Sequence, residues 1–263
     1  GDRLLTNWQY NPYFEVRARK YRFRILNGCV SRYFKLALVD QRNRPVPFHM
    51  VANDGNIMEH AVAFDGTLGT QAGILPMQSI AERYDIVIDF SRFRAGDRLY
   101  LVNLLEHKDG RKPERTIPLA DVLAGRYRPV ERDDNGDGLT DRWLNGDPCV
   151  GKFLEFRVQP YSGVDQSMNP ANYIAGRQKM IPLNRPSAAN LAVARHRTFS
   201  FGRSSGTDSK PWTVRSDGDM AFGADPRRVT SAPDIGDGAA DGNGHLEIWR
   251  IENGGNGWSP PVH

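Results

Sequence analysis

Apolar and polar residues alternate in short runs along the first 160 residues of the chain. A strand places alternate side chains on opposite faces, so each run predicts a β-strand with one buried face. Turn-forming pairs such as Asn27-Gly28 and Asp65-Gly66 separate the runs, and a helical period is confined to 119–124. Many short strands between regular turns predict an all-β sandwich or barrel. The predicted strands cover residues 21–26, 33–39, 48–52, 84–90, 98–103 and 153–158.

Sustained periodicity stops after residue 160. Prolines with serine, asparagine and glycine between them predict an extended linker that runs over a surface, and they are Pro160, Pro170, Pro182 and Pro186. Strand-like runs resume at 197–201 and 246–251, but this last segment is too short for a complete sandwich. We therefore predict a β domain over residues 1–160, a linker over 161–196 and the opening part of another β domain over 197–263.

Charge and hydropathy exclude several classes of function. Lys and Arg number 35 against 31 Asp and Glu, and in 17–24 the basic residues alternate with apolar ones, as on the solvated face of a sheet. Nucleic-acid binding would need a clustered basic patch, so we expect no nucleic-acid partner. No run approaches the roughly 18 apolar residues of a membrane helix, so we expect no membrane span. Cys29 and Cys149 fit either a single disulfide or two buried free thiols.

Four sequence blocks, in one order along nearly the whole chain, resemble a known family. They are FEVRARKYRFRILNG at 14–28, AERYDIVIDF at 81–90, FLEFRV at 153–158 and EIWRIEN at 247–253. These blocks resemble bacterial multicopper oxidases, the laccase-like enzymes of the spore-coat laccase and bilirubin oxidase type. The resemblance implies a middle cupredoxin-like domain, a Greek-key β-sandwich, followed by the linker and the start of a third cupredoxin domain.

The resemblance also implies a parent protein that oxidises phenols, aromatic amines or metal ions such as Mn(II) and reduces dioxygen to water. The family binds a type 1 copper through two His and a Cys, and a trinuclear copper cluster through H-x-H pairs. Such pairs suit a strand, because alternate positions aim both imidazoles into one cavity. None of the six His residues here forms an H-x-H pair, and no Cys adjoins a His. We therefore predict that the chain alone is inactive and that the remaining first- and third-domain portions pack against it. The family suggests a secreted, periplasmic or cell- or spore-surface location.

One histidine matches a copper ligand of the family. The final residues, WSPPVH at 258–263, resemble the start of the ligand motif H-P-x-H-x-H. His263 then falls at a trinuclear-cluster position, while the preceding type 1 ligand position is Pro260, which has no side chain able to bind a metal. We expect His263 to bind copper in the parent protein and to be exposed to solvent in the chain given.

A second pattern suggests calcium. Residues 133–141 read D-x-N-x-D-G-x-x-D, which places oxygen ligands at alternating positions and a glycine where a calcium loop turns sharply. The twelfth position is Leu144 in place of the bidentate Glu of an EF-hand. The pattern fits a calcium loop of an extracellular module, and it also fits an acidic, glycine-rich surface loop. The side-chain ligands would be Asp133, Asn135, Asp137 and Asp141, with the Leu139 carbonyl beside them.

Three other histidines favour a structural role over a catalytic one. We interpret His49, His60 and His107 as structural, with His107 on a surface loop. A competing hypothesis is a non-catalytic cupredoxin-type scaffold or interaction module, stabilised by calcium, which Pro260 favours. Further copper ligands encoded directly after His263 would establish the oxidase, whereas a stop codon there would support the scaffold.

Overall fold

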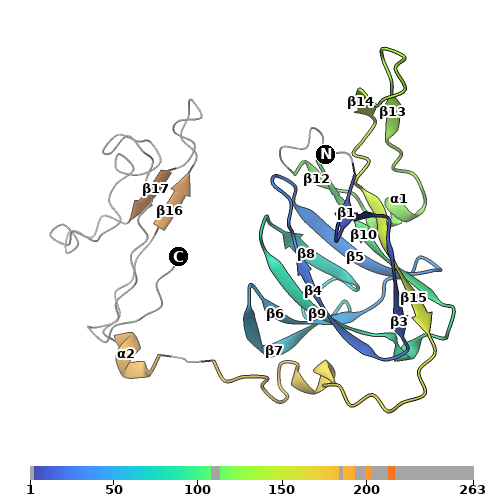
Figure 1. Cartoon of the computed structure of the whole chain (residues 1–263). Coiled ribbons are helices and arrows are strands. Elements are labelled where there is room, and N and C mark those ends of the chain that lie inside the picture. The colour runs from blue at the N-terminus through green and yellow to red at the C-terminus, as the bar shows by residue number, and fades with distance from the viewer. Residues whose placement is uncertain (1–2, 108–112, 184–185, 193–198, 203–212, 217–263) are drawn as a thin grey trace. The chain divides into compact units, whose positions relative to one another are not determined.

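The computed structural model describes residues 3–107, 113–183, 186–192, 199–202 and 213–216 (Figure 1). The chain divides into two compact units, Gly1–Leu183 and Asn184–His263. In the second unit the described elements are helix α2 (Ala188–Ala192) and an antiparallel pair, β16 (Phe199–Gly202) and β17 (Thr213–Ser216). The strand predicted at 197–201 overlaps β16, and the one predicted at 246–251 lies outside the described residues.

Two sheets form the body of the first unit (Figure 1). The five-stranded sheet has the order β3-β15-β10-β5-β8, and the four-stranded sheet has the order β4-β9-β6-β7. Neighbouring strands are antiparallel, except that β3 runs parallel to β15. The strands are β3 (Tyr13–Arg17), β4 (Lys20–Leu26), β5 (Phe34–Asp40), β6 (Phe48–Asn53), β7 (Asn56–Phe64), β8 (Ile74–Gln78), β9 (Arg83–Asp89), β10 (Arg98–Asn103) and β15 (Gly151–Gln159).

The chain crosses repeatedly between the two sheets. Consecutive strands β3 and β4 lie in different sheets, as do β5 and β6, β8 and β9, and β9 and β10. Such crossovers between packed antiparallel sheets are typical of Greek-key sandwiches. The predicted all-β class is confirmed for the first unit.

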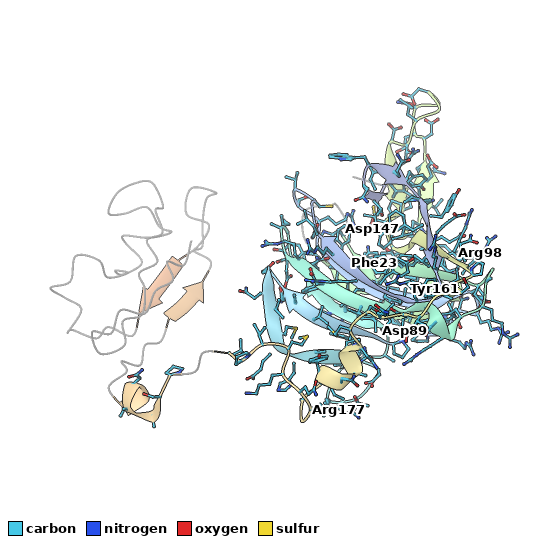
Figure 2. All side chains as sticks on the ribbon, turned by 60° about the horizontal axis from the view of Figure 1, so that its bottom comes forward. Phe23, Asp89, Arg98, Asp147, Tyr161 and Arg177 are labelled. Carbon is cyan, nitrogen blue, oxygen red and sulfur yellow. The ribbon has the colours of Figure 1, made fainter. Side chains whose placement is uncertain are left out.

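Three phenylalanines join the sheets at the centre of the core. Phe23 of β4 lies 5.1 Å from Phe156 of β15, and Phe90, which begins the short helix η1 (Phe90–Arg92), lies 5.5 Å from Phe156, measured between ring centroids. The tilted rings have the offset geometry that aromatic pairs prefer. Figure 2 shows side chains filling the space between the sheets, with Phe23 among them.

Smaller elements surround the sandwich. Helix α1 (Leu119–Leu123) covers part of the outer face of the five-stranded sheet. Its Leu119, Val122 and Leu123 pack on a buried cluster that includes Val39 and Val102. Three short antiparallel strand pairs complete the first unit (Figure 1). These elements are β1 (Leu5–Thr6), β2 (Gln9–Tyr10), β11 (Leu105–Glu106), β12 (Arg115–Thr116), α1 (Leu119–Leu123), β13 (Val130–Arg132) and β14 (Arg142–Leu144).

Residues 161–183, here called the covering segment, pack on the outer face of the four-stranded sheet. Tyr173 and Met180 contact an apolar cluster of buried sheet residues, which consists of Val51, Ala61 and Val87. The segment contains one short helix, η2 (Pro170–Tyr173), and otherwise has irregular backbone. It forms the first part of the predicted linker, and the division between the two units falls inside that linker. The domain boundaries at 160 and 196 stay predictions.

Candidate functional site

The copper-ligand position predicted at His263 lies outside the described residues, as do Pro260, His196 and His245. Within the described ranges, no group of three or more His, Cys, Asp or Glu side chains could hold a metal ion. A type 1 centre needs two imidazoles and a thiolate together, and a trinuclear cluster needs paired imidazoles. The described part of the chain therefore does not fit a copper centre.

Two of the described histidines make structural contacts in separate strands. His49 lies in β6 opposite Val87 of β9, and burial lowers the pKa of its imidazole, which favours the neutral ring. His60 lies in β7, and its Nδ1 is 3.2 Å from the carbonyl oxygen of Tyr173 in the covering segment. Both positions agree with the structural interpretation.

The prediction that His107 lies on a surface loop is wrong. Its exposed fraction is 2%. The ring stacks on Tyr33 with centroids 6.3 Å apart, and its Nε2 accepts a hydrogen bond of 3.2 Å from the Tyr33 backbone N–H. An accepting Nε2 carries no proton, so the neutral ring has its proton on Nδ1. The residues that follow, Lys108-Asp109-Gly110, indicate a loop, but they give no sign that Tyr33 covers the imidazole.

A buried ion pair anchors this region. The Nη1 atom of Arg32 lies 2.5 Å from Oδ2 of Asp147, and the two side chains are 8% and 1% exposed. Asp147 also accepts hydrogen bonds from the backbone N–H groups of His107 (2.7 Å) and Cys149 (2.9 Å). These additional bonds matter, because a buried carboxylate is tolerated only when it is paired and hydrogen-bonded.

The polar network extends to Tyr127. The Tyr127 hydroxyl donates to Glu106 at 2.8 Å and accepts from the Asp147 backbone N–H at 2.5 Å. Burial raises the pKa of Tyr127, so the phenol stays protonated and can donate. Glu106 in turn pairs with Arg115 at 2.7 Å. Sequence reasoning missed this network, because Arg32 and Asp147 are 115 residues apart and neither belongs to a recognisable motif.

The predicted calcium ligands lie on one exposed turn at the tip of the β13–β14 hairpin (Figure 1). Asp133 accepts from the backbone N–H groups of Gly136 (2.6 Å) and Gly138 (2.8 Å), and these bonds lower its pKa. Asp141 accepts from the Asp134 N–H at 2.8 Å. The four predicted ligands thus lie on one turn with their oxygens bound to its own amides, and they do not form a group of three acidic side chains that could hold a metal ion.

Comparison with solved structures shows the fold class. The crystal structure of McoA multicopper oxidase from the hyperthermophile Aquifex aeolicus matches 81% of this chain and 34% of that chain, with 20% sequence identity and a TM-score of 0.50. The first unit therefore has the cupredoxin-type β fold of multicopper oxidases, as the sequence predicted.

Sequence relatives of the chain include a bilirubin oxidase, a laccase and a cell division protein. Bilirubin oxidase of Albifimbria verrucaria is 29% identical over 267 residues, which cover 100% of this chain and 35% of that protein. Laccase of Bacillus subtilis is 33% identical over 103 residues, 39% of this chain and 17% of that protein. The cell division protein FtsP of Dickeya dadantii is 32% identical over 92 residues, 35% of this chain and 17% of that protein. The chain matches no protein-family model.

The homologues of the chain thus include bilirubin oxidase and bacterial laccases, and the chain fits a fragment of a laccase-like multicopper oxidase. It spans about a third of the length of bilirubin oxidase. Within the described ranges, the helices are too short or too polar to cross a membrane.

Proposed function

We propose that the chain is the middle domain, linker and first part of the third domain of a copper-dependent oxidase. The parent protein oxidises phenolic or aromatic compounds or metal ions and passes the electrons to dioxygen, which is reduced to water. The observation that supports this most strongly is the similarity to bilirubin oxidase along 100% of the chain.

The role of the chain in this proposal is structural. Its described residues contain no group of three metal ligands, so the copper centres require residues from other parts of the parent, with His263 as one ligand. A rigid sandwich suits this role, because a metal site shared between domains must be held in a fixed geometry. The chain alone is then inactive.

An oxidase assay on the whole product of the gene tests the activity. Oxygen uptake is measured with a phenol, an aromatic amine and Mn(II), each with and without added copper. Copper-dependent uptake with at least one of them supports the proposal, and its absence with all three overturns it. The preferred reductant then distinguishes an organic substrate from a metal ion.

A second candidate is a non-catalytic scaffold in which the 133–141 loop binds calcium. The similarity to FtsP favours it, because that relative carries the name of a cell division protein. The D-x-N-x-D-G-x-x-D spacing of residues 133–141 supports the calcium part.

Thermal unfolding with calcium or magnesium tests the loop. Calcium binding would raise the midpoint temperature, and Asp137→Asn would remove the increase because it deletes one ligand charge. Asp121→Asn, in an exposed ion pair with Arg126, is the matched control and should keep the increase. If calcium does not raise the midpoint temperature, the loop is an acidic surface turn and the calcium part of this candidate is wrong.

A further inference from the structure

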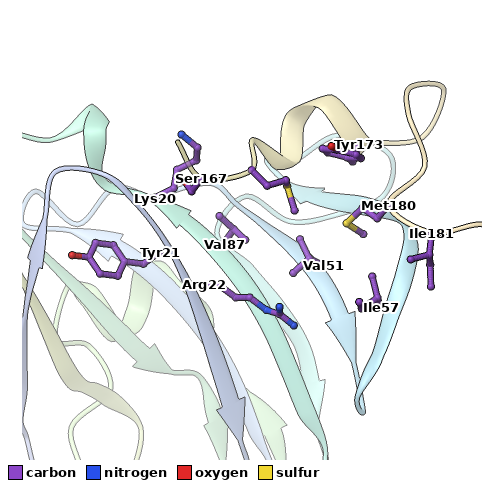
Figure 3. A pocket seen from close by; sticks show the side chains of 11 residues that line it. Lys20, Tyr21, Arg22, Val51, Ile57, Val87, Ser167, Tyr173, Met180 and Ile181 are labelled. Carbon is purple, nitrogen blue, oxygen red and sulfur yellow. The ribbon is translucent and has the colours of Figure 1, made fainter. Parts of the chain in front are cut away.

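A pocket of about 370 Å³ lies between the four-stranded sheet and the covering segment (Figure 3). The sheet supplies an apolar floor, and the segment supplies two methionines, a tyrosine and an isoleucine. The volume falls in the range of pockets that hold small molecules. The apolar lining consists of Val51, Ile57, Val87, Met168, Tyr173, Met180 and Ile181.

The roof of the pocket is held on the sheet by specific contacts near its C-terminal end. Ile174 forms a parallel bridge with Ala61 of β7. Farther along, the Met180 N–H donates to the Glu59 carbonyl at 2.8 Å, and the Lys179 ammonium pairs with the Glu59 carboxylate at 2.7 Å. Met180 therefore has a fixed position against the sheet.

The N-terminal end of the roof is fastened by one carboxylate. Asp165 accepts from the backbone N–H of Lys20 at 2.8 Å and from its ammonium at 3.0 Å. Asp165 also accepts from the Ser167 hydroxyl and N–H. With both ends attached, the pocket is a built feature of the first unit.

Residues 19–24, along the β4 edge of the sheet beside the pocket, carry an excess of positive charge. Arg19 and Lys20 share Asp165, at 3.7 and 3.0 Å. Arg22 and Arg24 share Asp85, Arg24 at 3.6 Å and Arg22 closer. Four cations therefore face two carboxylates. Asp89, opposite Lys20 in the β4–β9 register, does not change this excess because it has its own cation, Arg92, at 4.0 Å.

Arg22 lines the pocket and has donors beyond those bound to Asp85. Its Nε and Nη2 atoms bond to Asp85, while the side chain remains 45% exposed. The Nη1 group is thus available for an anion, and guanidinium groups bind carboxylates with well-defined geometry. Arg24 pairs with the same Asp85 but does not line the pocket.

We propose that this pocket binds a planar aromatic anion, such as an aromatic carboxylate. The ring would lie on Val51 and Val87 beneath the thioethers of Met168 and Met180, since methionine sulfur makes favourable contacts with aromatic rings. The anionic group would reach Arg22 at the β4 edge. An aliphatic acid would gain burial but lack the sulfur–aromatic contacts. The inference concerns binding only and does not require copper.

Calorimetric titration of the chain with 2-naphthoate tests the proposal, with 2-naphthylmethanol as the neutral analogue and octanoate as the aliphatic anion. We expect 2-naphthoate to bind at least about tenfold more tightly than 2-naphthylmethanol, because its carboxylate adds a charge-assisted hydrogen bond. It should also bind more tightly than octanoate, because its ring adds the sulfur–aromatic contacts. No binding of 2-naphthoate, or equal binding of octanoate, would overturn the proposal.

Matched variants locate the site. Arg22→Met should remove the preference for the anion. Arg24→Met also removes one positive charge next to Asp85, but it should keep that preference within about twofold. Equal losses in both variants would indicate non-specific attraction to the basic strand and would overturn the proposal. Ile57→Trp provides a separate test if Arg22→Met does not fold, because Ile57 is 45% exposed and the larger ring would fill the pocket. Unchanged binding by a folded Ile57→Trp protein would contradict the site.

Discussion

Arg32 and Asp147 form an ion pair inside the first unit, and their side chains are only 8% and 1% exposed. The pair connects the turn before β5 to the approach to β15, which are 115 residues apart. Arg32→Met should lower the free energy of unfolding by about 3–5 kcal/mol, because it leaves the Asp147 carboxylate buried without its cation. Urea denaturation followed by circular dichroism measures this change.

Two controls test the cause. Arg126→Met breaks an exposed pair with Asp121 and should cost no more than about 1 kcal/mol. The double variant Arg32→Met/Asp147→Leu should be more stable than Arg32→Met alone, because no unpaired charge remains buried. A double variant as unstable as the single one would show that the loss comes from packing.

Asp165 should make stability depend on pH below about 4. Hydrogen bonds from Ser167 and Lys20 lower its pKa in the folded state. A lowered folded-state pKa gives stability that is present above the unfolded-state pKa of about 3.9 and lost as pH falls through the folded-state value. The unfolding free energy of Asp165→Asn should therefore approach that of the unchanged chain in acid. A difference that stays constant from about pH 6 to pH 3 would contradict this prediction.

Gly73 is required where β5 and β8 approach each other. Its φ is +67°, and an added Cβ would lie 2.9 Å from the carbonyl oxygens of Leu38 and Val46. Gly69 has a similar φ of +79° with no atom within 4 Å of such a Cβ. Gly73→Ala should therefore cost about 1–3 kcal/mol more than Gly69→Ala in urea denaturation. Equal costs would mean that backbone conformation alone explains both.

The two cysteines should differ in reactivity. Neither forms a disulfide, and Cys149 is buried whereas Cys29 is partly exposed. Burial raises the pKa of the Cys149 thiol to about 12 and also raises the pKa of Cys29, and the thiolate is the reactive form. Cys29 should be alkylated first in the native chain, and both should react in urea. Mass spectrometry of tryptic peptides measures this order, and equally fast labelling of native Cys149 would contradict the burial.

Local patterns predicted the sandwich well because strand alternation reports which face is buried. The run predicted at 21–26 lies in β4, where Tyr21, Phe23 and Ile25 pack on the core. The run predicted at 98–103 has the same bounds as β10 (Arg98–Asn103). The helix predicted at 119–124 corresponds to α1 (Leu119–Leu123).

Contacts between distant residues could not be predicted in the same way. His107 is buried because Tyr33 packs on it, and that contact joins positions 74 residues apart. The proline-rich segment after residue 160 has no period that would show Tyr173 and Met180 packing on a sheet. The pocket under that segment therefore became visible only in three dimensions. The copper-ligand hypothesis for His263 concerns a residue outside the described ranges.

Copper content tests the central claim most directly. After incubation with copper and removal of the excess, copper per chain is measured for the 263-residue chain and for the whole gene product, together with visible absorption and oxygen uptake. The account predicts no stoichiometric copper and no blue copper–thiolate absorption for the chain, but stoichiometric copper together with oxygen uptake for the whole product. A stoichiometric blue copper on the chain alone, or a whole product that binds no copper, would contradict it.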